Sequence, residues 1–554
     1  MKKTKKILSL AMALCLGSGC LLGAAACGGT QEDYGDKTVL RIGLFEGGWG
    51  SEWLNKVIAK FESEYPEYKV LVDGDKTKYN QGSLLATIDT GRQDLFIAPM
   101  YLYDAVSQNK FMDITELMNT PLNEIVTSSS DTATIQSKMW SDLDEYYKSY
   151  NNEGKYYSIP FGGGIYSLNY DRDLFDRESL FIKAGTGINY DGSGTIEWVN
   201  ESASLSVGQD GEAGTFDDGL PVTYNDFKAL LVRMKQRNVI PFIWSKENSY
   251  LNNFLNSFIA SYEGKDNFNL FKTMDGEYTF AGDTTATQIT KDNAYLLQGM
   301  TGKKNAIQFA YDLVLDSANY HQDSGRETCD FLAAQNKYLL SVDLAKSGMD
   351  KPVAFLIDGA HWYNEAKSTI DEMAAESDDY KDRRFGIMPF PKMEGTKATK
   401  ATYYASSFTQ QVFIRKHAEQ PELAKLFLAY LHTEESLRTC TQYSGMVRPL
   451  AYTMPTELLN TMPYYYQSLW NAFKDADIVH NLSTNPYVYK NESFFEYEWL
   501  FTCHTSSGVN LSCPISDFMV NTKKAIGVNG YVEAMAYTFN ADKWEKDVLS
   551  KAGV

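Results

Sequence analysis

The side chains best suited to chemistry in this sequence stand just after an apolar run, where "VAFLI" is followed by Asp358 and, four residues later, Trp362. Asp358-Gly359 is a turn signal, so a strand should end there and leave the next residues outside the core. An indole ring beside a carboxylate suits the non-covalent recognition of a flat, half-polar ligand. We therefore predict that Trp362 is a ligand platform; the alternative is that it packs between helices.

Many hydrolytic enzymes carry recognisable sequence motifs, and two of these motifs are absent from this sequence. Neither G-x-S-x-G nor H-E-x-x-H occurs. A secreted glycoside hydrolase needs two carboxylates that flank the scissile bond, but among 71 Asp and Glu residues their mere presence decides nothing. We predict that the protein is not an enzyme, with a glycoside hydrolase as the less favoured alternative.

Two loops have the composition of a metal site or a cross-link. "DGEAGTFDDG" crowds Asp210, Asp217 and Asp218 with glycines, and carboxylate oxygens are ligands for calcium. The loop lacks EF-hand spacing, so a solvated acidic turn is favoured over a calcium site. Cys503 and Cys513 bracket a second loop, where a disulfide and two free thiols are both compatible with the spacing. No cofactor is predicted.

Composition limits the classes of partner. The chain has 554 residues, enough for two or more lobes with their own cores. Its net charge of −19 argues against nucleic-acid binding, which needs a basic surface. Aromatic residues make up 14% of the chain, with 37 Tyr and 9 Trp among them, and these are side chains that meet half-polar ligands.

The N-terminal segment has the pattern of an export signal: a basic start, an apolar stretch, small residues and then a polar segment. Cys27 follows three alanines and precedes Gly-Gly, which resembles a bacterial lipobox, although Ala24 stands where leucine is usual. We predict a lipoprotein signal peptide over 1–26 and a lipid-anchored tether over 27–37, with plain secretion as the alternative. No later segment has about 18 uninterrupted apolar residues, so the lipid is the only predicted membrane contact.

Strands and helices are predicted to alternate after the tether. The patterns indicate strands over 38–45, 69–74 and 94–99, and helices over 54–68 and 79–91. This order predicts parallel βα units, which bind ligands at the carboxyl ends of their strands.

Segments in the same order resemble extracellular solute-binding protein family 1, the sugar receptors of ABC importers. No single motif is specific, but the set runs through nearly the whole mature chain. The segments are "LRIGLF", "FESEYPEYKVLV", "IDTGRQDLFIA", "NKFMDITELM", "KYYSIPFGGGIYSLNYDRDLFD", "PVTYNDFKALLVRMKQRNVIPF", "FGIMPFPKMEG" and the late helix that ends in "YSGMVRPL". An enlarged middle segment, 189–221, is similar to the long branch of the family in Gram-positive bacteria.

The resemblance implies an α/β, two-lobed, periplasmic-binding-protein-like fold (type II) with a ligand cleft between the lobes. The first lobe is expected to take 38–158 plus 392–440, and the second 159–391 plus 441–554. The implied function is capture of a carbohydrate, an oligosaccharide, by a monomer at the extracellular face of the cell membrane. The implied partners are the transmembrane permease subunits of an ABC transporter. The alternative is a receptor for a non-sugar solute such as a peptide or a polyamine.

The resemblance also implies ligand contacts near the ends of strands and at the crossings between lobes. The predicted contacts are Glu46, Trp49, Trp53, Tyr101, Phe161, Gly163, Tyr166, Trp244, Asp358, Trp362 and Arg448. Packing is the alternative for each of them, and for Arg448 a structural ion pair is equally compatible with the sequence.

The lipobox-like segment gives a testable prediction. Cys27→Ser should abolish lipid labelling and release the protein into the medium or leave it as uncut precursor, because the serine hydroxyl replaces the thiol that would carry the lipid. Metabolic labelling with a fatty acid measures this. Unchanged labelling of the variant would contradict the assignment and move it to Cys20 or Cys15.

Overall fold

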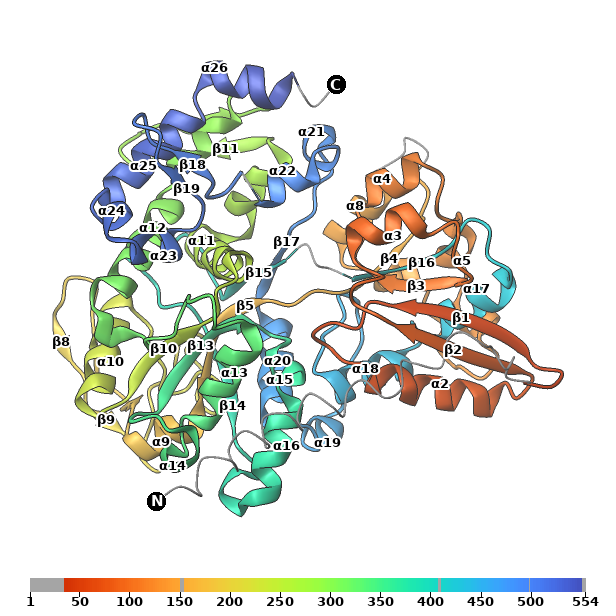
Figure 1. Cartoon of the computed structure of the whole chain (residues 1–554), viewed down its shortest axis with the longest axis horizontal. Helices are drawn as coiled ribbons and strands as arrows, with labels where there is room; N and C mark the ends of the chain where they lie inside the picture. Colours follow the sequence, from red (N-terminus) through yellow and green to blue (C-terminus); the bar gives the residue numbers. More distant parts are fainter. Residues whose placement is uncertain (1–33, 150–153, 407–409, 498, 551–554) are drawn as a thin grey trace, which may run out of the picture.

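Two α/β lobes lie side by side in the computed structural model of this protein (Figure 1). The structure describes residues 34–149, 154–406, 410–497 and 499–550, so the predicted signal peptide, Cys27 and most of the tether lie outside the described residues. Each lobe is built around its own sheet, which confirms the predicted fold class.

The first lobe contains a five-stranded sheet with the order β2-β1-β3-β16-β4. Its strands are β1 (Thr38–Leu44), β2 (Tyr68–Gly74), β3 (Leu95–Ala98), β4 (Ile159–Gly162) and β16 (Gln410–Ile414). β1 is parallel to β2 and β3, as expected for βα units, whereas β16 is antiparallel to β3 and β4. Its helices are α2 (Glu52–Glu64), α3 (Gln81–Thr87), α4 (Leu102–Ser107), α5 (Thr115–Asn119), α6 (Leu122–Ile125), α7 (Ile135–Lys138), α8 (Ser141–Ser149), α17 (Pro421–Tyr430) and α18 (Glu434–Ser444).

The second lobe contains a four-stranded sheet with the order β10-β13-β5-β14. Its strands are β5 (Tyr166–Asp171), β10 (Ile240–Trp244), β13 (Val353–Gly359) and β14 (Phe385–Met388). β10 and β13 are parallel, and β5 is antiparallel to both β13 and β14. Every residue of β13 is buried, as in a strand covered on both faces. Helices around it include α9 (Arg172–Glu178), α10 (Tyr224–Gln236), α11 (Asn248–Thr273), α13 (Phe331–Leu340), α14 (Leu344–Ser347), α15 (Trp362–Glu365), α16 (Lys367–Glu376), α19 (Thr456–Leu459) and α20 (Tyr464–Asp475).

Smaller elements extend the second lobe. The described two-stranded sheets pair β6 (Phe181–Ile182) with β9 (Trp198–Val199), β7 (Gly187–Ile188) with β8 (Gly194–Thr195), β11 (Gly276–Tyr278) with β12 (Thr287–Ile289), β15 (Thr402–Ala405) with β17 (Asp477–His480), and β18 (Cys503–His504) with β19 (Asn510–Leu511). The later helices are α12 (Thr301–Leu315), α21 (Pro486–Tyr489), α22 (Glu492–Tyr497), α23 (Pro514–Met519), α24 (Asn521–Lys524), α25 (Gly527–Thr538) and α26 (Ala541–Lys543). Short 3-10 or π turns are η1 (Ala294–Gly299), η2 (Ser317–Asn319), η3 (Asp378–Tyr380) and η4 (Trp544–Leu549).

The chain passes between the two sheets from β4 to β5, from β15 to β16, and from α18 to α20. Two predicted boundaries therefore differ from the structure. β4 begins at Ile159 but pairs with β16 in the first sheet, and β15 lies after the predicted boundary at 392 yet pairs with β17 and packs on α11. Both differences come from strand pairings between residues far apart in the sequence.

Buried apolar side chains form two clusters. One cluster runs from the core of the first lobe to one face of the second sheet. It includes Leu356 of β13 and Trp362 of α15. The other fills the opposite face of that sheet, under Phe355 and Trp244. Within the described part of the chain, no helix is both long and apolar enough to cross a membrane.

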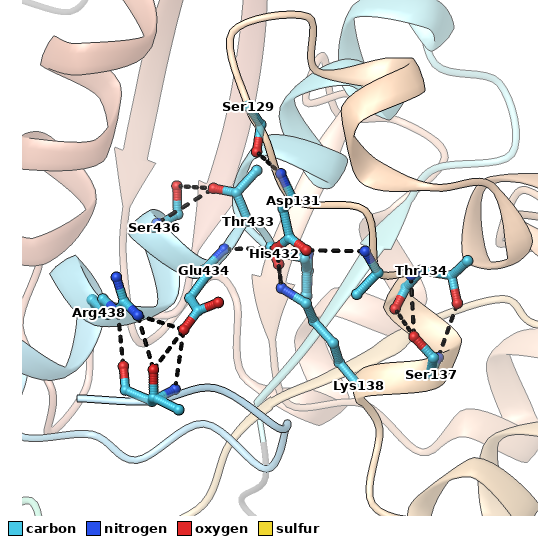
Figure 2. A network of polar contacts seen from close by, with 12 residues as sticks. Ser129, Asp131, Thr134, Ser137, Lys138, His432, Thr433, Glu434, Ser436 and Arg438 are labelled. Atoms are coloured by element: carbon cyan, nitrogen blue, oxygen red, sulfur yellow. Dashed lines mark hydrogen bonds and ion pairs between the residues drawn. The ribbon is translucent and has the colours of Figure 1, made fainter. Parts of the chain in front are cut away.

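A buried polar network joins the loop before α7 to the start of α18 (Figure 2). Asp131 forms an ion pair with Lys138, and its carboxylate also accepts the backbone N–H of Glu434 at 3.0 Å. Lys138 donates to the carbonyl of His432 at 3.1 Å. The Asp131 and Lys138 side chains are only 10% and 6% exposed, so each charge depends on the other for compensation.

Removing one member of this pair should be costly. Asp131→Ala should lower the free energy of unfolding by about 3–5 kcal/mol, because the Lys138 ammonium stays buried without its counter-ion. Denaturant unfolding measures the change. Asp89→Ala is the matched control: its ion pair with Lys110 has a carboxylate that is 49% exposed, and its loss should cost less than about 1 kcal/mol. Equal effects in the two variants would contradict the proposed burial cost.

Candidate functional site

A cavity of about 490 Å³ lies between the two lobes. Both lobes line it: the loop after β1, with Lys76, comes from the first lobe, while residues near the starts of α11, α13 and α15 come from the second. The lining residues are Phe45, Glu46, Gly47, Gly48, Trp49, Gly50, Lys76, Gly164, Tyr166, Ser249, Tyr250, Phe331, Leu332, His361, Asn364, Glu365, Ser406 and Gln410.

The strand ends explain why these residues meet. β1 ends at Leu44 and β13 at Gly359, and the segments that follow both strands form walls of the cavity. β10 runs parallel to β13, so the chain after Trp244, which leads to Ser249 and Tyr250, opens at the same edge. Ligand sites at the carboxyl ends of parallel strands are the general rule for α/β sheets.

His361 is one of the residues that line the cavity. Its ring lies edge-on to Trp49, Tyr166 and Tyr250, with centroids 6.1, 6.1 and 5.8 Å away. A Cβ added at Gly359 would lie 2.3 Å from Cε1 of the imidazole, and one added at Gly164 would lie 2.9 Å from Nδ1. The imidazole can therefore occupy this place only because these positions are glycine.

Two carboxylates lie beside His361. Asp358, 1% exposed, accepts the N–H of Gly359 at 2.7 Å and an N–H of the Gln335 amide at 3.1 Å. The same Gln335 nitrogen donates to Glu365 at 2.7 Å. Burial, and then the charge of Glu365, raise the pKa of Asp358 well above its ordinary value.

The structure brings three of the predicted contacts to the cavity: Glu46, Trp49 and Tyr166 line it. Glu46 is exposed and accepts a hydrogen bond from the Ser51 hydroxyl at 2.8 Å. Asp358 does not line the cavity. It shares the Gln335 amide as hydrogen-bond donor with Glu365, which does line the cavity. Gly163 is outside the lining, which uses its neighbour Gly164.

Three other predicted contacts form a stack inside the protein. Phe161 contacts both the ring of Trp53, with centroids 4.9 Å apart, and the guanidinium of Arg448, which lies 3.8 Å from the Phe161 ring centre. Arg448 is 0% exposed, forms no ion pair with a described residue, and has one nitrogen 3.0 Å from Nε2 of His432. Burial lowers the pKa of Arg448 to about 10. This arginine thus makes a structural cation–π contact, neither the predicted ligand contact nor the alternative ion pair.

Trp244 and Tyr101 also lie away from the cavity. Trp244 is 0% exposed and packs against Tyr320, with ring centroids 5.0 Å apart. Tyr101 lines a separate gap of about 20 Å³ with Lys272 and Gln411. This gap beside Tyr101 is too small for an organic ligand, so it belongs to a packed interface.

The ligand-platform prediction for Trp362 is wrong in this structure. Its side chain is 0% exposed, and its ring lies 5.2 Å from Phe385, 5.4 Å from Tyr465 and 5.6 Å from Tyr338. The reason is the turn that begins α15. That turn directs His361 and Glu365 to the cavity, whereas Trp362, one residue after His361, faces the core.

The structure also describes the two loops for which the sequence left alternatives open. The Asp217 carboxylate accepts the N–H of Gln209 at 2.6 Å, and that of Asp218 accepts the N–H of Gly214 at 2.6 Å, as in a self-bonded acidic turn. Cys503 and Cys513 are both buried, free thiols, with Cys503 opposite Leu511 in the β18–β19 pair.

The prediction missed several residues of the wall, notably His361, Glu365, Tyr250 and Phe331. His361 and Glu365 are four residues apart and follow the same strand as Asp358, so their spacing was a usable signal for a shared face. Tyr250 and Phe331 lie in the first turns of α11 and α13, and no local motif connects these helices to the cavity.

Comparison with known proteins gives the family. Residues 47–437, more than half of the chain, match the model of the bacterial extracellular solute-binding proteins. This chain belongs to that family, as its resemblance predicted. No curated protein sequence matches the chain significantly.

Solved structures share the fold over nearly the whole chain. RafE in complex with raffinose is 13% identical, with a TM-score of 0.53, and covers 92% of this chain and 100% of its own. Apo RafE from Streptococcus pneumoniae is 14% identical, with a TM-score of 0.52, over 92% and 99%. A probable secreted solute-binding lipoprotein from Streptomyces coelicolor is 11% identical, with a TM-score of 0.52, over 90% and 98%. At these identities the likeness shows the fold alone.

The burial of Trp362 gives a second prediction about stability. Trp362→Ala should lower the free energy of unfolding by about 3–5 kcal/mol, because it opens a cavity among Tyr338, Phe385 and Tyr465. Denaturant unfolding of the protein without any ligand measures it. Trp198→Ala, at a half-buried tryptophan of β9, is the control and should cost clearly less. A Trp362 variant as stable as the wild type would return this residue to the ligand platform.

Proposed function

We propose that this solute-binding protein captures a carbohydrate, an oligosaccharide, in the cavity between its lobes and delivers it to an ABC transporter permease at the outer face of the cell membrane, anchored through Cys27. The observation that carries the proposal is the mixed lining of the cavity, in which aromatic rings and hydrogen-bonding groups from both lobes face one space of about 490 Å³. That volume is in the range of small-molecule sites.

Aromatic rings and polar groups both line the cavity, as the recognition of a sugar requires. Sugars present apolar C–H faces, which rings such as Trp49, Tyr250 and Phe331 cover, and hydroxyl edges, which carboxylate and amide groups bind. Asn364 is held for this role: its side chain donates to the Ser444 carbonyl at 2.6 Å and accepts from the Tyr466 hydroxyl at 2.5 Å. RafE, whose structure with raffinose shares this fold, supports the same ligand class.

Delivery requires that the protein with bound solute differ in conformation from the empty protein, so that a transporter can distinguish the two. The loop after β1 and the start of α15 belong to different lobes and reach the same cavity, so a ligand that touches both favours the closed arrangement. The crossing from β4, which ends at Gly162, to β5, which begins at Tyr166, is short, and a short link of this kind suits hinge closure around a bound solute.

Calorimetry after a thermal-shift screen across oligosaccharides tests the proposal. A binding sugar at a hundredfold its Kd should add about 2.7 kcal/mol of stability to the protein. Trp49→Ala should weaken that sugar about thirtyfold, the equivalent of about 2 kcal/mol, because it removes a ring from the wall. Trp198→Ala, at a half-buried tryptophan outside the cavity, should leave the affinity unchanged.

The same samples separate the alternatives. Recovery of the sugar unchanged after long incubation supports a receptor, whereas cleaved sugar would indicate a glycoside hydrolase. Stabilisation by peptides or polyamines, with no response to any sugar, would replace the carbohydrate by a non-sugar solute. Equal sugar affinity of the Trp49 and Trp198 variants would place the site elsewhere.

A further inference from the structure

Three side chains of different chemistry meet at the wall of the cavity. Asp358, His361 and Glu365 each offer one ligand atom, and these atoms all lie within 4.8 Å of one another. Asp358 is the penultimate residue of β13, His361 precedes α15, and Glu365 ends it, so a single strand-turn-helix segment presents all three. His361 and Glu365 also line the cavity, which leaves the group accessible from the solute side.

Among the described residues, no Lys or Arg is paired with this group, and Lys76, which lines the same cavity, lies over the Phe331 ring. Asp358 and Glu365 form no ion pair with a Lys or Arg among the described residues, although Asp358 is 1% exposed. Glu247 is a further carboxylate, and its negative charge repels that of Asp358. The Oε2 of Glu247 is buried with no described hydrogen-bond partner. Carboxylates gathered out of water repel one another unless a proton or a cation lies among them, and a nearby imidazole provides a further ligand for a cation.

Gln335 provides a second, independent observation about this group. Its side chain is 0% exposed, and its nitrogen donates to both Asp358 and Glu365, which fixes the orientation of the two carboxylates. Its Oε1 is buried without a described partner, an acceptor left open beside the group. Hydrogen bonds that orient ligand carboxylates from behind are typical of metal sites.

We propose that Asp358, His361 and Glu365 form a site for a divalent transition-metal ion of the zinc class in the wall of the solute cavity. One imidazole nitrogen with two carboxylate oxygens suits such ions, whereas calcium and magnesium prefer oxygen ligands only. Ligand atoms about 2.1 Å from an ion lie about 3–4 Å apart, so the three side chains need to contract by only about 1 Å.

Three protein ligands leave at least one coordination position open. Because His361 and Glu365 face the cavity, the open position points toward the solute, where water or a solute oxygen completes the coordination. The metal site is therefore independent of which solute the protein binds, and it can be tested without any sugar.

The test is metal binding by the full mature chain after treatment with a chelator. Equilibrium dialysis against Zn²⁺, with the bound metal measured by mass spectrometry, should give one ion per chain. His361→Gln and Glu365→Gln should each weaken zinc at least tenfold, and Gln335→Leu should weaken it by about tenfold through the orientation of the carboxylates. Ca²⁺ should not displace the zinc at equal concentration, and Co²⁺ should give a visible spectrum that the His361 variant loses.

His321→Gln is the matched control, because His321 lies 3.9 Å from Asp323 but outside the cavity. It should bind zinc as the wild type does. Melting curves confirm that each variant is folded, and His361 and Glu365 are only half-buried, so their conservative replacements leave the core intact. Failure of the wild type to bind zinc, equal binding by the His361 and Glu365 variants, or an equal loss in the His321 variant would each overturn the proposal, whatever the outcome of the sugar experiments.

Discussion

A guanidinium group stacked on a phenylalanine ring holds the crossings of this protein together. Phe161 is in β4, just before the first crossing, and Arg448 is in the crossing that follows α18, so their contact at 3.8 Å fixes two passages of the chain to each other. Trp53, at the start of α2, also packs against the Phe161 ring. Because Trp53 follows the loop after β1, the stack also sets the position of the wall that carries Trp49.

The same contact explains why a charge can be kept out of water here. Arg448 is fully buried without an ion pair among the described residues, and burial alone would make it very unfavourable. The face of Phe161 and the ring nitrogen of His432 provide partial compensation. His432 is tied by its carbonyl to Lys138 and so to Asp131, which connects the crossing to the network in Figure 2. The crossing after α18 is thus joined to the first lobe through a continuous path of polar contacts rather than through apolar packing only.

Sequence patterns predicted the fold well where structure depends on neighbouring residues. The predicted strands over 38–45, 69–74 and 94–99 correspond to β1, β2 and β3, and the helix over 54–68 overlaps α2, because side-chain periodicity determines each of them. The lobe boundaries at 159 and 392 were less accurate. They depend on the pairing of β4 with β16 and of β15 with β17, and no local pattern specifies such long-range partners.

The candidate site shows the same limit at the scale of single residues. The end of β13 at Asp358-Gly359 was visible in the sequence, but the first turn of a helix rotates the chain by about 100° per residue. That rotation decides that His361 faces the cavity and Trp362 faces Tyr338 and Phe385. Gly164 and Gly359 leave room for the imidazole, yet neither glycine indicates by itself which side chain fills the space. The rigid strand therefore limits the choice to a few neighbouring residues, and packing of the largest ring into the core leaves the smaller, polar ones to face the solute.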